Sequence, residues 1–138
     1  MNHISQIYCS IRGIVAVIAG FLGWFLGGMD SLLTALTIFV VLDYLTGIMC
    51  GIVEKHLSSE IGFRGIMRKA MIFFIVGIAH SVDAYIICSG SAIRSMICLF
   101  YISNEGISII ENAARIGLPI PEKLREVLAQ IKEDGEAA

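Results

Sequence analysis

Four apolar stretches, each close to the length of a bilayer-crossing helix, leave little of the sequence for anything else. They run over about residues 11–28, 31–53, 70–88 and 92–110. The hydrocarbon core of a bilayer is about 30 Å thick, and a helix needs roughly 20 apolar residues to cross it. Inside lipid, backbone polar groups must be satisfied internally, as they are in a helix. The sequence therefore predicts an all-α integral membrane protein with about four transmembrane helices.

The composition agrees with lipid as the main solvent. Hydrophobic residues make up 57% of the 138-residue chain and charged residues 16%, against about 45–50% and about 25% in soluble domains. The net charge is -2, without long runs of one sign, so we expect no nucleic-acid partner. The cysteines form no CxxC pair, and motifs for phosphate binding, serine hydrolysis or zinc proteolysis are missing. We expect no catalytic residue, cofactor or metal site, and no enzyme.

Basic residues alternate between the polar segments. Residues 54–69 carry four Lys or Arg side chains, and the tail carries another four from Arg115 onward. The turn at Asp30 has none, and the turn near Ser89 has Arg94. Because cytoplasmic loops are enriched in Lys and Arg, four spans with both termini in the cytoplasm fit this pattern. Three spans remain possible, because polar residues weaken the end of the fourth stretch.

The last part of the chain differs from the rest. Pro119 and Pro121 end the apolar region, and Ile120, Leu124 and Val127 then recur at helical spacing between charged residues. We therefore divide the chain into a transmembrane helical domain, residues 1–115, and a cytoplasmic segment, residues 116–138. The second segment is expected to be a short amphipathic helix followed by a loose acidic tail.

Polar side chains inside the apolar stretches are candidates for function, because a central charge costs about 2.5–3.5 kcal/mol on insertion scales. Asp43 shares one helix face with Gly47 and Gly51, which would let a neighbouring helix approach and hide the carboxyl from lipid. Asp43 could line a pore or control its state, or it could be a packing carboxyl. His80 and Asp83, three residues apart, could form a pH-sensitive contact, or Asp83 could lie near the outer interface.

Two further groups complete the candidates. In the first stretch, Gly20, Gly23 and Gly27 follow a small-residue spacing typical of close helix packing, within one chain or between chains. In the fourth stretch, Asn104 and Glu105 are intramembrane polar candidates.

Three segments resemble the phage lysis and toxin-secretion holins. The first is Leu42-Asp43-Tyr44-Leu45-Thr46-Gly47, with the apolar residues before it. The second is the polar loop from Leu57 to Lys69, which contains Arg64 and Gly65, running on to His80 and Asp83. The third is Ser103-Asn104-Glu105-Gly106 through Glu111-Asn112-Ala113 to Gly117-Leu118-Pro119-Ile120-Pro121. Together these segments cover about residues 33–128 in the order that the family shows.

The resemblance implies a homo-oligomer in the bacterial host cytoplasmic membrane that opens non-specific lesions and collapses the membrane potential. Its functional partner would be a peptidoglycan hydrolase or a secreted toxin, without necessary direct contact. The family pattern assigns no chemistry to the residues that it marks. The main alternative is a small proton-coupled transporter or ion channel that uses the carboxyl of Asp43 in the second span. A second alternative is an accessory subunit or assembly factor that forms no pore.

The small and polar stripe suggests how a switch could work. We hypothesise that carboxyls such as Asp43 stay hidden in a packed bundle while copies are sparse, and line water once many chains assemble. Small residues at Gly23, Gly27, Gly47 and Gly51 would permit both packings.

Overall fold

The structure is a computed structural model that describes residues 3–137, and within this range it contains helices and short connections without strands. Four helical segments are long and apolar enough to cross a membrane, which confirms the predicted all-helical membrane fold. The elements are α1 (His3–Phe25), α2 (Ser31–Val53), α3 (Ser59–Val82), the single π-helical segment η1 (Asp83–Ile87), α4 (Ala92–Arg115) and α5 (Glu122–Ala137).

The bounds of α2 and the start of α4 agree with the expected spans 31–53 and 92–110, whereas the other helix boundaries differ. Helix α1 already begins at His3 and ends at Phe25, because Gly27 and Gly28 adopt left-handed backbone angles, φ 81° and 89°, that end the helix. The expected polar loop 54–69 is mostly helical. Ser58 caps α3 by accepting a hydrogen bond from the backbone N–H of Ile61 at 3.2 Å, and α3 therefore starts at Ser59.

Arg64 and Gly65, expected in a loop, consequently lie on the first half of α3. The polar side chains of this segment suited a loop and a helix equally well, and the capping serine decides between them. At the other end of the chain, α5 continues to Ala137, so the backbone of the expected loose acidic tail is helical as far as that residue. Helix α4 likewise runs on to Arg115, beyond the predicted end at residue 110.

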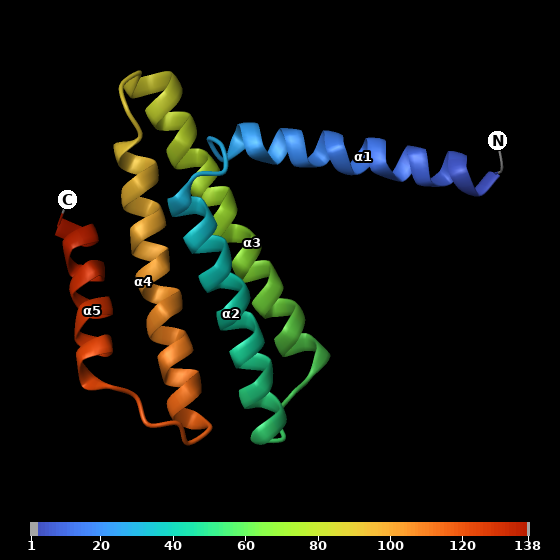
Figure 1. Ribbon diagram of the computed structural model, residues 1–138. Helices are drawn as coiled ribbons and strands as arrows, with labels where there is room; N and C mark the ends of the chain where they lie inside the picture. Colours follow the sequence, from blue (N-terminus) through green and yellow to red (C-terminus); the bar gives the residue numbers. More distant parts are fainter. Residues whose placement is uncertain (1–2, 138) are drawn as a thin grey trace.

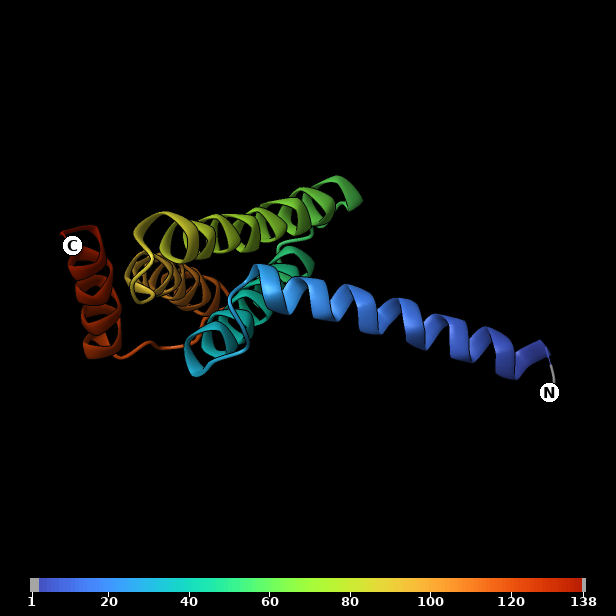
Figure 2. The same ribbon diagram turned by 90° about the horizontal axis from the view of Figure 1, so that it is seen from above.

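Helices α2, α3 and α4 form a bundle around one apolar core. Helices α2 and α4 lie side by side, and α3 crosses this pair at an angle (Figures 1 and 2). The second half of α3 is packed in the bundle, whereas most of its first half, residues 59–69, is exposed. The fully packed core consists of Leu33, Leu36, Val40, Ile72, Val76 and Cys98.

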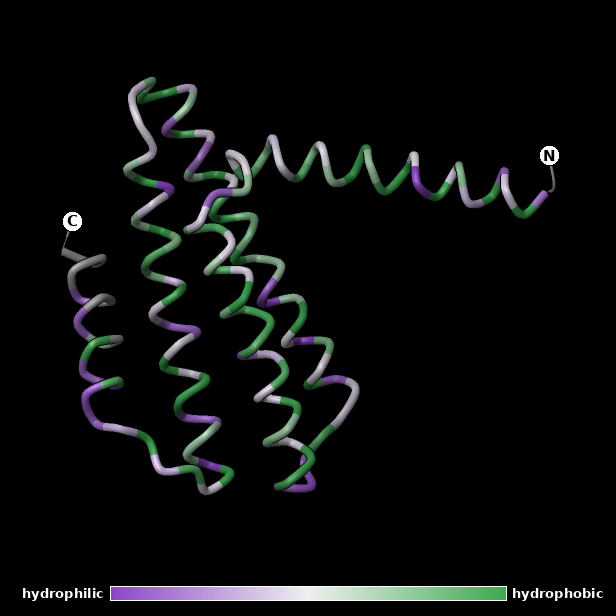
Figure 3. Tube along the Cα trace, viewed as in Figure 1, coloured by the Kyte–Doolittle hydropathy of each residue, from purple (hydrophilic) through white to green (hydrophobic). Residues whose placement is uncertain are grey.

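The outer helices have different relationships to this bundle. Helix α1 projects sideways from the bundle, and none of its residues His3–Phe25 is buried (Figures 1 and 2). Its surface is apolar along most of its length (Figure 3). Helix α5 folds back beside α4 and is the most hydrophilic of the helices (Figures 1 and 3).

Candidate functional site

A buried cluster of charges links the three bundle helices. The ammonium group of Lys69 on α3 donates hydrogen bonds to the carboxylates of Asp43 on α2 and Glu105 on α4. Asp43 retains 8% of its exposure and Glu105 7%. A single ammonium group therefore serves two carboxyl groups that come from two different helices. We refer to Asp43, Lys69 and Glu105 as the charge triad.

Asn112 extends the triad along α4. Its Nδ2 lies 3.3 Å from Oδ1 of Asp43 and 3.1 Å from Oγ1 of Thr46. The backbone carbonyl of Asn112 accepts a hydrogen bond from the thiol of Cys50 at 3.1 Å. These contacts are between α2 and α4, so polar bonds as well as apolar packing hold this pair together.

Burial of the triad depends on how α3 crosses the other two helices. Ionised groups taken out of water are tolerated when they are paired and hydrogen-bonded. Residues before Lys69 lie mostly on exposed helix, and residues after it enter the core, so Lys69 is placed where α3 meets the α2–α4 pair. The single positive charge of Lys69 thus partly balances the two carboxylates inside the bundle. The same contacts set the position along α2 and α4 at which α3 crosses them.

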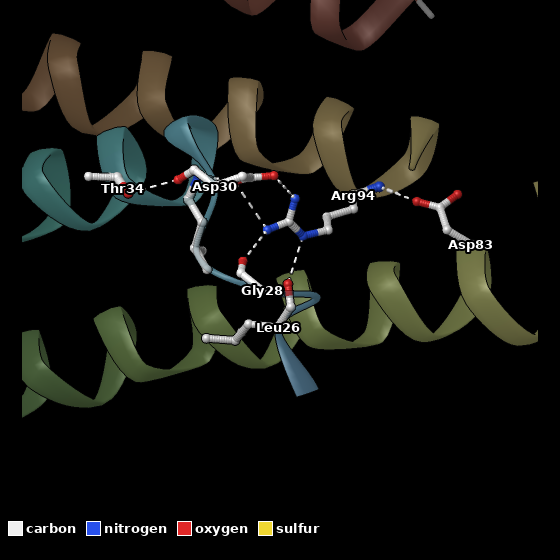
Figure 4. Close-up of polar contacts among 7 residues, drawn as sticks. Leu26, Gly28, Asp30, Thr34, Asp83 and Arg94 are labelled. Atoms are coloured by element: carbon white, nitrogen blue, oxygen red, sulfur yellow. Dashed lines mark hydrogen bonds and ion pairs between the residues drawn. The ribbon is translucent and has the colours of Figure 1, made fainter. Parts of the chain in front are cut away.

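A second polar network lies at the end of the bundle where α4 begins. The guanidinium of Arg94, at the start of α4, donates to the backbone carbonyls of Leu26 at 2.7 Å and Gly28 at 3.0 Å. It also donates to Oδ2 of Asp30 at 2.6 Å. Figure 4 shows Arg94 reaching into the α1–α2 connection with all these bonds made by one side chain. Arg94 is only 2% exposed, and it fastens this connection to α4.

Two carboxylates complete the Arg94 network. Asp83 accepts hydrogen bonds from the backbone N–H groups of Ile93 at 3.2 Å and Arg94 at 2.8 Å, which caps the first turn of α4. Asp30 caps α2 by accepting from the N–H of Leu33 at 2.8 Å. The hydrogen bond from Arg94, followed by that from Leu33, holds the pKa of the Asp30 carboxyl below its usual value.

His80 and Asp83 have separate surroundings despite their helical spacing. His80 is packed against the α1–α2 connection, and a Cβ added at Gly27 would lie 2.5 Å from its Nδ1. The carboxylate of Asp83 faces the start of α4, and no hydrogen bond joins it to His80 among residues 3–137. The π-helical segment η1 begins at Asp83 and changes the helical phase only after it, so the two groups are separated by their different neighbours and not by η1.

The candidate glycines also occupy different environments. A Cβ at Gly20 or Gly23 would meet no atom within 4 Å, so these positions face open space in the single chain. Gly27 lies in the α1–α2 connection and therefore does not continue a helical GxxxG face. A Cβ at Gly47 would be 3.9 Å from Nδ2 of Asn112, and one at Gly51 would be 3.1 Å from Leu57.

The two residues of the family pattern on α3 have contrasting roles in packing. A Cβ at Gly65 would lie 3.5 Å from the ring of Tyr44, so Gly65 lets the aromatic side chain from α2 reach α3. Arg64 is exposed and pairs with Glu60, one turn earlier, at 2.8 Å. Asn104 is partly buried on α4 beside Glu105, without a bond to the triad.

A hollow of about 330 Å³ opens beside the triad, between the first half of α3 and the α2–α4 pair. We call it the wedge. Apolar residues form part of its lining, among them Ile48, Leu57 and Ile61. Polar and charged lining residues include Asp43, Glu54, His56, Arg68, Lys69, Ser108, Asn112 and Arg115. The charge triad therefore borders an open hollow, whereas the guanidinium of Arg94 is bonded to backbone carbonyls of the α1–α2 connection.

Sequence reasoning assigned Lys69 and Arg94 to polar connections and used them only as indicators of topology. Asp30 and Asn112 were not candidates. Lys69 is followed directly by the apolar part of α3, and this position at the border of a span was a usable signal. Nothing in the sequence indicated that Arg94 would bond to carbonyl groups more than sixty residues away.

Comparison with known proteins identifies the family. Residues 20–133 match the sequence model of the bacteriophage holin family. The chain belongs to this family. The resemblance seen over residues 33–128 is thereby confirmed, and the four apolar helices agree with a multi-pass membrane protein.

Several relatives of this holin-family protein carry no assigned role. An uncharacterized 14.9 kDa protein from the nagH 3' region of Clostridium perfringens is 44% identical over 108 residues, covering 78% of this chain and 82% of the relative. An uncharacterized protein of Clostridium perfringens strain 13 is 42% identical over 129 residues, covering 91% and 92%. A probable holin of Bacillus phage phi105 is 32% identical over 112 residues, covering 81% and 82%. No solved structure matches the chain.

Proposed function

We propose that this protein oligomerises in the bacterial cytoplasmic membrane, with both termini in the cytoplasm, and opens non-specific lesions there. A peptidoglycan hydrolase or a large toxin then crosses, and the membrane potential collapses. The observation that carries the proposal is the match to the bacteriophage holin family over residues 20–133. Family membership itself suggests a holin role, and the lesion and its cargo are our extension of it.

Helix α1 supports self-association. None of its 23 residues is fully buried in the single chain, and Gly20 and Gly23 present backbone that another helix can approach closely. In a bilayer, lipid covers this surface while copies are sparse. At high density, the same surface is available to neighbouring copies without unfolding the bundle.

The charge triad supports a change from a closed to a water-lined state. Asp43 and Glu105 share Lys69 inside the bundle, next to the wedge. A movement of α3 away from α2 and α4 would separate Lys69 from the carboxylates, and the three charged groups would then favour contact with water. We propose that assembly of many copies stabilises this separated arrangement, with Asp43 lining the lesion.

Inducible expression in bacteria tests the function directly. We expect an abrupt stop in growth, loss of membrane potential measured with a voltage-sensitive dye, and release of cytoplasmic β-galactosidase when a peptidoglycan hydrolase is co-expressed. Continued growth with normal potential at confirmed membrane accumulation would contradict the proposal.

Two variants test the switch at equal membrane expression. Asp43→Leu removes one carboxylate from the triad, and Gly47→Leu places a bulky side chain beside Asn112. We expect both to change the time of onset, with Glu60→Gln on the exposed face of α3 as a control that keeps the wild-type schedule. Unchanged onset in both variants would contradict a role for the triad in triggering.

The wedge favours one alternative function, a small proton-coupled transporter or ion channel. It reaches Asp43 and Lys69, so ions or protons could approach the triad through it. Such a protein would conduct ions or change uptake in vesicles without releasing cytoplasmic enzymes. The β-galactosidase measurement therefore separates this function from lesion formation.

A further inference from the structure

The mouth of the wedge has one basic side chain, Arg68, without an acidic partner in the described part of the chain. Of the basic residues that line the wedge, Lys69 is bound by Asp43 and Glu105. Arg115 is bound by Glu54, with Nε 3.0 Å from Oε1. The guanidinium of Arg68 has no hydrogen-bond or ion-pair partner among the side chains that the structure describes.

His56 adds a second donor at this mouth. It lies three residues beyond the end of α2, is exposed, and also lines the wedge. Both acidic side chains of the lining, Asp43 and Glu54, already have basic partners. Charge complementarity therefore favours an anion close to Arg68 and His56.

The wedge continues into a hollow on the outer surface of the bundle. This second hollow measures about 440 Å³ and shares Tyr44, Ile48 and Leu57 with the wedge. It extends to Phe63 and Ile66, which are 65% and 50% exposed and belong to an apolar surface. A ligand with a hydrocarbon chain can thus reach the mouth sideways from the bilayer.

From these observations we propose that the wedge binds an anionic phospholipid. The guanidinium of Arg68 donates to the headgroup phosphate, for which its planar fork is suited, and His56 provides a second donor. One acyl chain lies along Ile48 and Leu57 toward Phe63. Most of the basic residues lie at this end of the bundle, which places the lipid in the cytoplasmic leaflet under the positive-inside rule.

The bound lipid has a structural consequence. It occupies the space between α3 and the α2–α4 pair, next to Lys69, and therefore holds the first half of α3 away from the pair. The proposal concerns a binding site and depends on residence in a membrane. It does not require that the protein form lesions.

Native mass spectrometry of the purified full-length protein in detergent can test this site. Phosphatidylglycerol is titrated against phosphatidylcholine, and lipid adducts per chain are counted. We expect phosphatidylglycerol to be preferred, and Arg68→Gln to weaken its binding about tenfold, the effect of one charge-assisted hydrogen bond. Equal binding of the two lipids to the wild-type protein would overturn the proposal.

Arg64→Gln is the matched control, because it removes the same charge at a position one helical turn before Arg68. Arg64 is paired with Glu60 and does not line the wedge. We expect Arg64→Gln to retain wild-type affinity. Equal losses in Arg64→Gln and Arg68→Gln would overturn the proposal in favour of unspecific surface attraction. Helix content measured by circular dichroism ensures that folded variants are compared.

Two further arms address the acyl chain and the source of the anion. Ser108→Phe, from the α4 side of the wedge, fills the hollow without changing charge, and we expect it to reduce phosphatidylglycerol adducts as well. Unchanged adducts in folded Ser108→Phe would overturn the placement of the lipid in the wedge. Millimolar inorganic phosphate should leave lipid adducts unchanged, and displacement of the lipid would overturn the commitment to a phospholipid in favour of a soluble anion.

Discussion

The middle of the helical bundle and the end where α4 begins each bury a basic side chain, but they do so in opposite ways. Arg94 bonds to two backbone carbonyls and to Asp30, whose side chain is half exposed, so its partners belong to one short connection. Lys69 bonds to side chains on two different helices, next to an open hollow. The first arrangement holds the α1–α2 connection against α4 in one fixed geometry. The second arrangement is disrupted when α3 moves away from α2 and α4, and we therefore assign the proposed change of state to it.

The largest effect is expected from Lys69→Met at the triad. Loss of the ammonium leaves Asp43 and Glu105 as two buried carboxyl groups without a cation, and breaking a buried ion pair costs about 3–5 kcal/mol. The free energy of unfolding, measured in mixed detergent, should fall by that amount. The triple variant Asp43→Leu, Lys69→Met, Glu105→Leu should recover most of the loss, since no unpaired charge remains. A lower stability of the triple variant than of Lys69→Met would contradict this account.

Arg94→Met should come next. It removes the donor of the carbonyls of half-buried Leu26 and exposed Gly28, and because water can replace that donor each lost hydrogen bond costs about 0.5–1.5 kcal/mol. Hydrogen exchange should speed up in residues 26–30 while the α2–α4 pair stays protected. The comparison of the two networks would fail if exchange increased equally throughout the bundle.

Gly77→Ala should loosen the attachment of α1 at the Arg94 end. The added Cβ would lie 2.1 Å from the ring of Phe25, the last residue of α1, so the ring must move. We expect a loss of about 1 kcal/mol, at the low end for overpacking because the ring is only partly buried. A spin label on α1 should report greater motion. Gly13→Ala, whose Cβ would meet no atom within 4 Å, is the matched control and should change neither reading.

Acidification should weaken the Arg94 end through Asp30. The pKa of Asp30 is lowered in the folded protein, so ionisation of this carboxyl adds stability above its unfolded pKa, near 3.8. This contribution is lost as the pH falls through the lower, folded value. It is under about 1 kcal/mol, because the side chain is 50% exposed and solvent screens the pair. The stability difference between wild type and Asp30→Asn should shrink as the pH is lowered from about 5 to about 3, by part of that amount, because the loss begins at the unfolded pKa and is complete only below the lower, folded pKa. A growing difference would contradict the sign.

The smallest effect should follow Arg64→Gln on the exposed face of α3. Its pair with Glu60 has side chains that are 73% and 81% exposed, and such i,i+4 pairs contribute about 0.3–0.5 kcal/mol. The unfolding free energy should change by no more than this. A loss of unfolding free energy as large as that of Lys69→Met would show that the exposed ion pair of α3 holds this helix in place more than the triad does.

Much of the architecture was predictable from local sequence. The four apolar stretches correspond to the four long helices, and the start of α2 at Ser31 follows from Asp30 as a helix-capping side chain. The start of α3 was missed, because residues 59–69 contain enough charge to read as a loop. The direction of α1 was also unpredictable, since its apolar surface is compatible with packing on the bundle or with lipid.

The candidate site was predictable only in part. Asp43 and Glu105 were chosen because charges in apolar helices are costly, and this reasoning needs no partner. Their joint partner Lys69 was counted with the loop charges, since α3 was expected to begin after it. His80 and Asp83 were grouped by helical spacing, but the start of α4 and the α1–α2 connection draw them to different surroundings.

The sequence by itself determined that this chain forms apolar helices in a membrane, because hydrophobicity and segment length act locally along the chain. Tertiary structure alone decided that Lys69 joins Asp43 to Glu105 and that Arg94 fastens the α1–α2 connection. The physical reason is that a buried charge is stabilised by whichever groups the crossing helices bring within hydrogen-bond distance. Those groups lie 26 to 68 residues away along the chain, and only packing in three dimensions selects them.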